Sequence, residues 1–156
     1  MDRDLEIKAS RPGGTKCPCC DKHAQIYKRK FLRSMAIELI NILPYYTMNP
    51  GMPLAINRYL VQRGIFHGSY SKLCFWGLLK QDTAQLAGKK HSGLYSITDK
   101  GILFAKNEVT IPEYVIEYNK SVIRFEGDDI SIRHTFKNLF DYDELMNEVY
   151  QYAAAY

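Results

Sequence analysis

Residues 69–79 read Ser-Tyr-Ser-Lys-Leu-Cys-Phe-Trp-Gly-Leu-Leu, and residues 92–106 read Ser-Gly-Leu-Tyr-Ser-Ile-Thr-Asp-Lys-Gly-Ile-Leu-Phe-Ala-Lys. The first stretch predicts a short helix that Ser69 caps and Gly77 ends. One face of this helix gathers Tyr70, Leu73 and Cys74. The apolar pair at 78–79 and the alternation at 94–97 predict a hairpin, and Thr98 caps the next helix.

Helix, hairpin and helix in this order resemble the recognition helix and wing of the winged-helix superfamily. The run Tyr95-Ser-Ile-Thr-Asp-Lys-Gly101 carries most of that resemblance. In such domains the helix before the hairpin usually enters a DNA major groove, and the hairpin loop lies along the phosphates. Winged helices also serve as protein-docking modules, so the resemblance indicates a fold more strongly than a function.

Other elements follow from hydrophobic periodicity. A helical stripe begins at Leu32, and Pro44 is expected to stop that helix. Residues 54–62 predict a second helix, which ends at Gly64. The stripe of the first helix consists of Leu32, Met35, Ala36, Leu39 and Leu43.

The last third of the chain predicts a hairpin and a helix. Residues 112–119 and 121–125 alternate with period two around a turn at Asn119-Lys120, and Gly127-Asp128-Asp129 is expected to break the pattern. Asp141 and Glu144 form a capping box for the final helix. Its apolar stripe consists of Tyr142, Leu145, Met146, Val149 and Ala153.

The predicted fold class is therefore α+β, with a winged helix-turn-helix core, an N-terminal Cys-rich arm, an added β-hairpin and a C-terminal helix. The predicted boundaries are 1–27 for a flexible arm with a Cys-x-x-Cys knuckle, 28–111 for the winged-helix domain and 112–156 for the extension.

Composition excludes several classes. Of the 156 residues, 46% are hydrophobic and 13% aromatic, which excludes a disordered chain. No apolar run is long enough to span a bilayer and no signal peptide opens the chain, so we expect a cytoplasmic protein that contacts no membrane. Residues 1–33 carry nine Lys/Arg against four Asp/Glu, whereas residues 112–156 carry four against nine. This polarity suits a nucleic-acid face separate from an acidic outward face, although solvated surface would look similar.

The chain also resembles a group of small, uncharacterised bacteriophage-encoded proteins over about residues 17–146. The matching segments are Cys17-Pro-Cys-Cys20, Tyr27-Lys-Arg-Lys30, Ser34-Met-Ala36, Tyr70-Ser-Lys-Leu73 with Trp76-Gly-Leu78, Ser92-Gly-Leu-Tyr-Ser-Ile-Thr98 and Ile111-Pro-Glu-Tyr-Val115. Cys19 and Cys74 lie outside the shared pattern. The resemblance implies a phage gene product, in the host cytoplasm, with a winged-helix core and no established activity to transfer.

Cys17 and Cys20 predict half of a zinc site, with His23 as the third ligand. A structural zinc site needs four ligands, and Cys19, Cys74, His67 or a second copy of the chain could supply the fourth. The alternative is a knuckle that keeps reduced thiols and binds no metal. Zinc is accordingly the one cofactor that the sequence suggests.

Seven residues are candidate DNA contacts. Three of them form a basic arm that is expected to open the first helix, two face outward from the recognition helix, and two lie in a wing loop that also contains His91. Phe75 also faces outward and Trp76 lies near the edge, unless both belong to the core or to a docking patch. The candidates are Lys28, Arg29, Lys30, Ser71, Lys72, Lys89 and Lys90.

These patterns predict a non-enzymatic winged-helix protein that binds double-stranded DNA, either as a transcription regulator or as a DNA-associated accessory factor. No catalytic motif is present in the sequence. The alternative is an interaction module that binds a host or phage protein through its aromatic and acidic C-terminal half, for example as an inhibitor of a host system. We also expect a homodimer through the C-terminal helix, unless its stripe packs on the chain's own hairpin.

Overall fold

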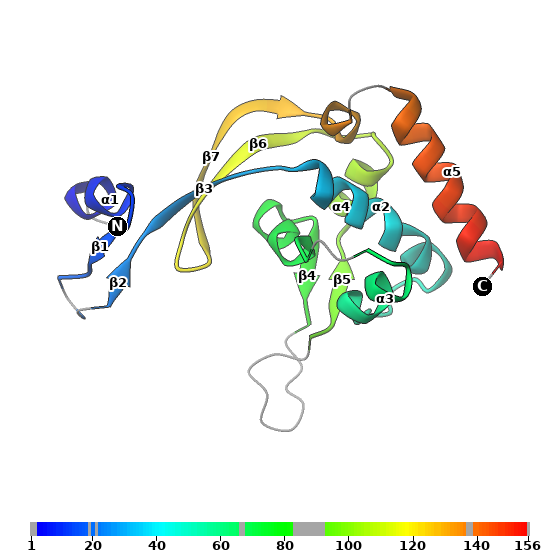
Figure 1. Ribbon diagram of the computed structural model, residues 1–156, viewed down its shortest axis with the longest axis horizontal. Coiled ribbons are helices and arrows are strands. Elements are labelled where there is room, and N and C mark those ends of the chain that lie inside the picture. The colour runs from blue at the N-terminus through cyan, green and yellow to red at the C-terminus, as the bar shows by residue number, and fades with distance from the viewer. Residues whose placement is uncertain are drawn as a thin grey trace. The chain divides into compact units, whose positions relative to one another are not determined.

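The computed structural model combines helices with small antiparallel sheets (Figure 1), which confirms the predicted α+β class. It describes residues 3–18, 20, 22–65, 68–82, 93–136 and 139–155. The chain forms two compact units, each built from two segments. The sheet unit joins Met1–Lys30 to Pro112–Asp129, and the helical unit joins Phe31–Ile111 to Ile130–Tyr156. The chain crosses between the units after residues 30, 111 and 129, whereas the sequence predicted boundaries after residues 27 and 111 and kept 112–156 together.

The sheet unit contains a short helix, a small hairpin and a three-stranded sheet. These are α1 (Arg3–Ala9), β1 (Thr15–Lys16), β2 (His23–Ala24), β3 (Ile26–Lys30), β6 (Ile111–Tyr118) and β7 (Ser121–Ile130). In the sheet, β6 lies between β3 and β7. Ala9, Ala24, Ile26 and Ile116 form a buried cluster. Residues 1–16, expected to be flexible, therefore contribute α1 and β1, because Ala9 has a small core to pack against.

The β6–β7 hairpin confirms the predicted turn and extends further than expected. Asn119 and Lys120 adopt φ values of 50° and 64°, which a two-residue turn of this hand requires. The strand β7 continues through Gly127 to Ile130, so the predicted break is wrong. A Cβ at Gly127 would lie 2.8 Å from the Tyr114 ring. The glycine thus admits a neighbouring side chain instead of ending the strand.

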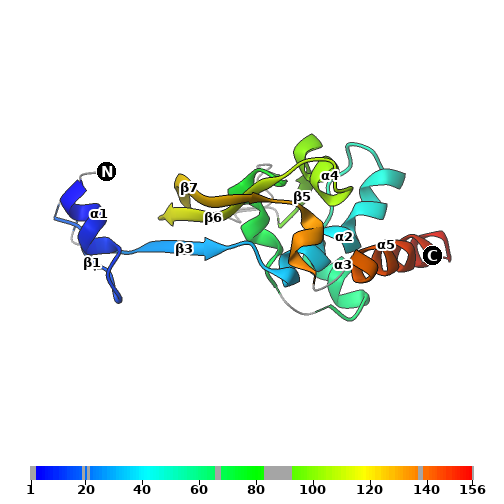
Figure 2. The ribbon, with the colours of Figure 1, turned by 90° about the horizontal axis from the view of Figure 1, so that it is seen from above.

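Most elements of the helical unit pack against the helix α2, which spans Arg33–Met48 (Figure 2). The elements of this unit are α2, α3 (Ile56–Gln62), the 3₁₀ helix η1 (Tyr70–Trp76), β4 (Leu79–Gln81), β5 (Tyr95–Ile97), α4 (Asp99–Ala105), the 3₁₀ helix η2 (Ile132–Thr135) and α5 (Leu139–Ala155). Phe31 packs edge-to-face on Trp76 at 5.5 Å and on Phe104 at 5.3 Å between ring centroids. Within the described residues, no helix is long and apolar enough to cross a bilayer.

The helix α2 passes through Pro44, so the predicted stop at this residue is wrong. A proline inside a helix costs about 3 kcal/mol. The turn beyond it makes contacts that offset this cost, because the Tyr46 hydroxyl donates to the Tyr95 carbonyl at 2.6 Å and the Tyr45 hydroxyl to the Pro53 carbonyl at 3.1 Å. The helix is buried on several sides, including Glu38 and Asn41, which a single apolar stripe does not predict.

The apolar pattern suggests that the second helix begins at Leu54, but in the structure Leu54 lies before this helix. It forms an antiparallel bridge with Tyr95, in which each backbone N–H donates to the other carbonyl, at 2.8 and 2.9 Å. The helix α3 therefore starts at Ile56. The bridge adds a third chain segment to the β4–β5 hairpin and joins the start of β5 to the connection between α2 and α3.

The last helix begins at Leu139, two residues before the predicted cap, so the capping box at Asp141 and Glu144 is wrong. Asp141 lies in the first turn and pairs with Arg33, with 3.6 Å between the charged atoms. The Tyr142 hydroxyl donates to the Ala105 carbonyl at 2.7 Å. Tyr142 and Val149 are buried, whereas Leu145 and Met146 are partly exposed. The predicted stripe therefore packs partly inside its own protomer, and a dimer stays a prediction.

Candidate nucleic-acid interface

The short helix predicted after Ser69 is present as the 3₁₀ helix η1. Gly77 ends it with a φ of 72°, as expected, but Ser69 makes no side-chain cap. Instead, the Ser69 backbone N–H donates to the buried Glu38 carboxylate at 3.1 Å. Leu73 and Trp76 are on the buried side of η1. The prediction that Trp76 lies near the edge is therefore wrong, and the alternative that it belongs to the core is confirmed.

The outward surface of η1 is small. Ser71 is exposed and Lys72 is half-exposed, as predicted. Phe75 is only partly exposed. The helix thus offers one hydroxyl and one cation, which suit contacts to phosphates or base edges.

A buried polar cluster supports η1 from within. The rings of Tyr70 and Tyr95 meet edge-to-face at 5.5 Å. Burial raises the pKa of both hydroxyls, and Glu38 adds to this effect at Tyr70. Burial also raises the pKa of the Cys74 thiol, against weaker opposing hydrogen bonds.

The run from Tyr95 to Gly101 has a physical explanation in the structure. The Thr98 hydroxyl accepts from the Gly101 N–H at 3.0 Å and caps α4, as predicted. The same hydroxyl lies within donating distance of the Gly77 and Leu78 carbonyls, at 2.6 and 3.1 Å. A Cβ at Gly101 would lie 2.1 Å from the Leu78 carbonyl oxygen. Thr98 and Gly101 together join the β4–β5 hairpin to the end of η1.

The cations of the predicted arm form strand β3 and do not open a helix, so that placement is wrong. Each of them has a carboxylate partner inside the sheet unit. The pairs are Lys28–Glu126 at 3.3 Å, Arg29–Glu117 at 2.8 Å and Lys30–Glu113 at 3.6 Å. Glu113 and Glu117 lie on β6, which pairs directly with β3, and Glu126 lies on β7 at the far side of β6. These charges are less available to phosphates than the sequence suggests.

The predicted wing contacts Lys89 and Lys90, together with His91, lie outside the described residues. The strands that frame this loop are described, with Leu79 opposite Ile97 and Gln81 opposite Tyr95 (Figure 1). The hairpin predicted from the sequence is therefore present up to Asp82, whose N–H donates to the Leu94 carbonyl at 2.8 Å.

Two further cations were not predicted from the sequence. Arg58 lies exposed on α3 and Lys80 lies exposed on β4, which packs against η1. Among the described residues, neither forms an ion pair with a carboxylate. The strand alternation could have identified Lys80, because its neighbour Leu79 is buried. For Arg58, no sequence pattern indicated that its side chain is exposed.

The candidate zinc ligands lie on and beside the β1–β2 hairpin. The Cys17 N–H donates to the Lys22 carbonyl at 2.7 Å and closes the loop that contains Cys20. Cys17 packs against the buried cluster, and His23 Nε2 lies 3.2 Å from the Gln25 side-chain oxygen. Over the described ranges, which omit Cys19 and His67, no three His, Cys, Asp or Glu residues gather as a metal site. Zinc therefore stays a prediction.

Comparison with protein-family models, with curated proteins and with solved structures found no match to this chain.

Proposed function

We propose that the helical unit is a winged-helix module that binds duplex DNA, and that the protein acts as a non-enzymatic regulator or DNA-associated accessory factor. Three helices, α2, α3 and η1, precede the β4–β5 hairpin, as a winged-helix core requires. The Leu54–Tyr95 bridge holds the start of β5, at the loop-side end of the hairpin. Because Thr98 also ties the hairpin to Gly77, η1 and the wing share one scaffold.

One observation carries the DNA assignment. Between Ser34 and Lys80 the sequence contains a single acidic residue, Glu38, and its side chain is fully buried. The surface of α3, η1 and β4 therefore presents cations without an exposed carboxylate from this stretch. Such a surface attracts phosphates by counterion release.

The proposed contacts are Ser71 and Lys72 on η1, Arg58 on α3 and Lys80 on β4, with Lys89 and Lys90 of the wing loop. Lys28, Arg29 and Lys30 have a smaller part in this proposal, because each is already paired with a carboxylate. A contact set made mainly of lysine and serine suits backbone binding with modest sequence specificity.

A fluorescence anisotropy titration with labelled duplex DNA tests the proposal. The Lys72→Gln/Lys80→Gln variant should bind about tenfold more weakly, and its salt slope should fall by about 0.9 for each phosphate that is no longer neutralised. The matched variant Lys28→Gln/Lys30→Gln removes the same charge from the sheet unit and should bind like the native chain. A native chain that binds no duplex even at low salt would contradict DNA binding. If only the sheet-unit variant weakens binding, the interface lies on the arm instead.

A further inference from the structure

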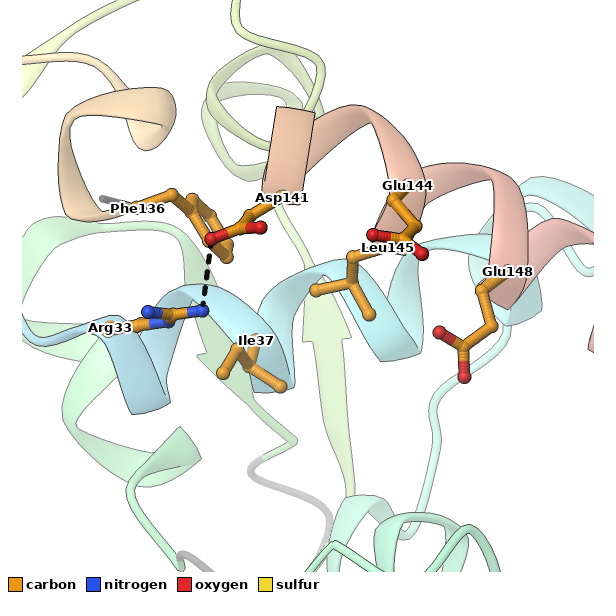
Figure 3. Close-up of a pocket in the computed structure, with 7 residues that line it drawn as sticks. All are labelled: Arg33, Ile37, Phe136, Asp141, Glu144, Leu145 and Glu148. Atoms are coloured by element: carbon orange, nitrogen blue, oxygen red, sulfur yellow. Dashed lines mark ion pairs between the residues drawn. The ribbon is translucent and has the colours of Figure 1, made fainter. Parts of the chain in front are cut away.

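A groove in the helical unit lies between α2 and α5 (Figure 3). None of the residues that line it is among the contacts proposed for DNA. Its volume is ≈ 230 Å³, which accommodates one or two side chains of a partner. Its lining combines apolar and charged groups: Arg33, Ile37, Phe136, Asp141, Glu144, Leu145 and Glu148.

The floor of the groove is apolar. Ile37 projects from α2 and Leu145 from α5, toward one another across the gap (Figure 3), and both are partly exposed. The Phe136 ring closes one side, with the Arg33 guanidinium 5.3 Å from its centroid. Burial of this apolar surface by a side chain of another molecule is favourable, because it removes the surface from water.

The rim of the groove is acidic and incompletely neutralised. Arg33 pairs with Asp141 at one end. Glu144 and Glu148 are exposed one helical turn apart, and no described residue forms an ion pair with either. The sequence of α5 contains no lysine or arginine to balance them. Two like charges in this spacing weaken a helix slightly, so helix stability does not account for them.

We propose that this groove binds a cationic amphipathic helix of a partner protein. An apolar side chain of that helix enters between Ile37 and Leu145, and lysines or arginines one turn apart pair with Glu144 and Glu148. The spacing of the two carboxylates matches cations at positions i and i+4 of a helix. Aliphatic floor and charged rim together fix the orientation of the bound segment.

The same charges argue against other occupants. Carboxylates on the rim repel DNA phosphates and anionic lipid headgroups. Within the described ranges no three metal-ligating side chains gather, so a cation site finds no support here. A second copy that docked its own α5 by two-fold symmetry would bring Glu144 and Glu148 toward like charges. The inference does not depend on DNA binding, because it uses none of the residues assigned to DNA.

The experiment uses the full chain and a short labelled peptide of leucine and lysine whose leucines fall on one helical face. Fluorescence anisotropy measures its binding. Glu144→Gln/Glu148→Gln should weaken binding about tenfold, as expected for two partly exposed ion pairs. The matched variant Asp128→Asn/Asp129→Asn removes the same charge from exposed positions on β7 and should bind normally. A peptide with glutamate in place of lysine should not bind.

The apolar floor is tested by Leu145→Ala, with Leu103→Ala on the exposed side of α4 as its control. The Leu145 variant should bind the peptide severalfold more weakly at unchanged circular dichroism, and the Leu103 variant should bind normally. If both charge variants lose the same peptide affinity, the binding depends on the net charge of the protein and not on the groove, and the proposal is overturned. No binding by the native chain would do the same. Light scattering that shows a dimer lost in Leu145→Ala would assign the groove to a second copy.

Discussion

At the scale of single residues, the buried Glu117 side chain joins two parts of the sheet unit, which no sequence pattern indicated. It lies in β6 with 3% of its surface exposed. One carboxylate oxygen accepts from Arg29 Nε at 2.8 Å, and the other accepts from the Lys120 N–H at 3.1 Å. It therefore links β3 to the β6–β7 turn, where Lys120 holds a left-handed backbone. A buried carboxylate of this kind is stable only while its partners remain.

We expect Glu117→Ala to destabilise the protein by about 2–3 kcal/mol, because Arg29 loses its partner and the turn loses an acceptor. Glu126→Ala is the control, since its ion pairs with Lys28 and Arg124 are exposed to solvent and should contribute little to stability. Urea unfolding followed by circular dichroism measures both variants. Equal urea midpoints for the two variants would show that the buried Glu117 contributes no more to stability than the exposed Glu126.

At the scale of elements, local backbone chemistry was predictable and long-range contacts were not. Thr98 caps α4 and Asn119-Lys120 forms a tight turn because both features depend on a few adjacent residues. The predictions at Pro44 and Gly127 were wrong, because long-range contacts decide the backbone there: the Tyr46 hydroxyl donates to the Tyr95 carbonyl, and the Tyr114 ring lies against Gly127. The candidate interface divides in the same way. Ser71 and Lys72 face outward as predicted, whereas the carboxylate that pairs with Arg29 lies 88 positions away along the chain.

Gly101→Ala should destabilise the helical unit, although alanine is normally about 1 kcal/mol better than glycine inside a helix. The added Cβ would lie 2.1 Å from the Leu78 carbonyl oxygen, so either α4 or the start of β4 must move. We expect a loss of about 1–3 kcal/mol, typical of overpacking. Differential scanning calorimetry gives the sign directly. A higher melting temperature would mean that helix propensity outweighs the close approach.

At the scale of the whole molecule, buried phenols couple stability to alkaline pH. Burial raises the pKa of Tyr142 to about 12, and the nearby Asp143 carboxylate adds to this effect. Burial also raises the pKa of Tyr46, whose hydroxyl donates to the Tyr95 carbonyl. Both hydroxyls lie inside the helical unit, which therefore keeps protons that an unfolded chain releases near pH 10.

Stability should consequently fall as pH rises from about 10 to about 12, because the native state then binds more protons than the unfolded state. Each such tyrosine contributes at most about 1.4 kcal/mol per pH unit. Tyr142→Phe should flatten this dependence, because it removes the buried hydroxyl. Unfolding midpoints across this range provide the measurement. An unchanged slope in Tyr142→Phe would refute the assignment.

The division of each unit into two segments also constrains how the chain folds during synthesis. The sheet unit lacks β6 and β7 until residues 112–129 have been translated, and the helical unit lacks α5 until residues 139–155 follow. Neither unit can close before the residues that follow Ile111 have been translated. Exposed strand β3 and the bare face of α2 would then be substrates for chaperones, which engage such unfinished surfaces.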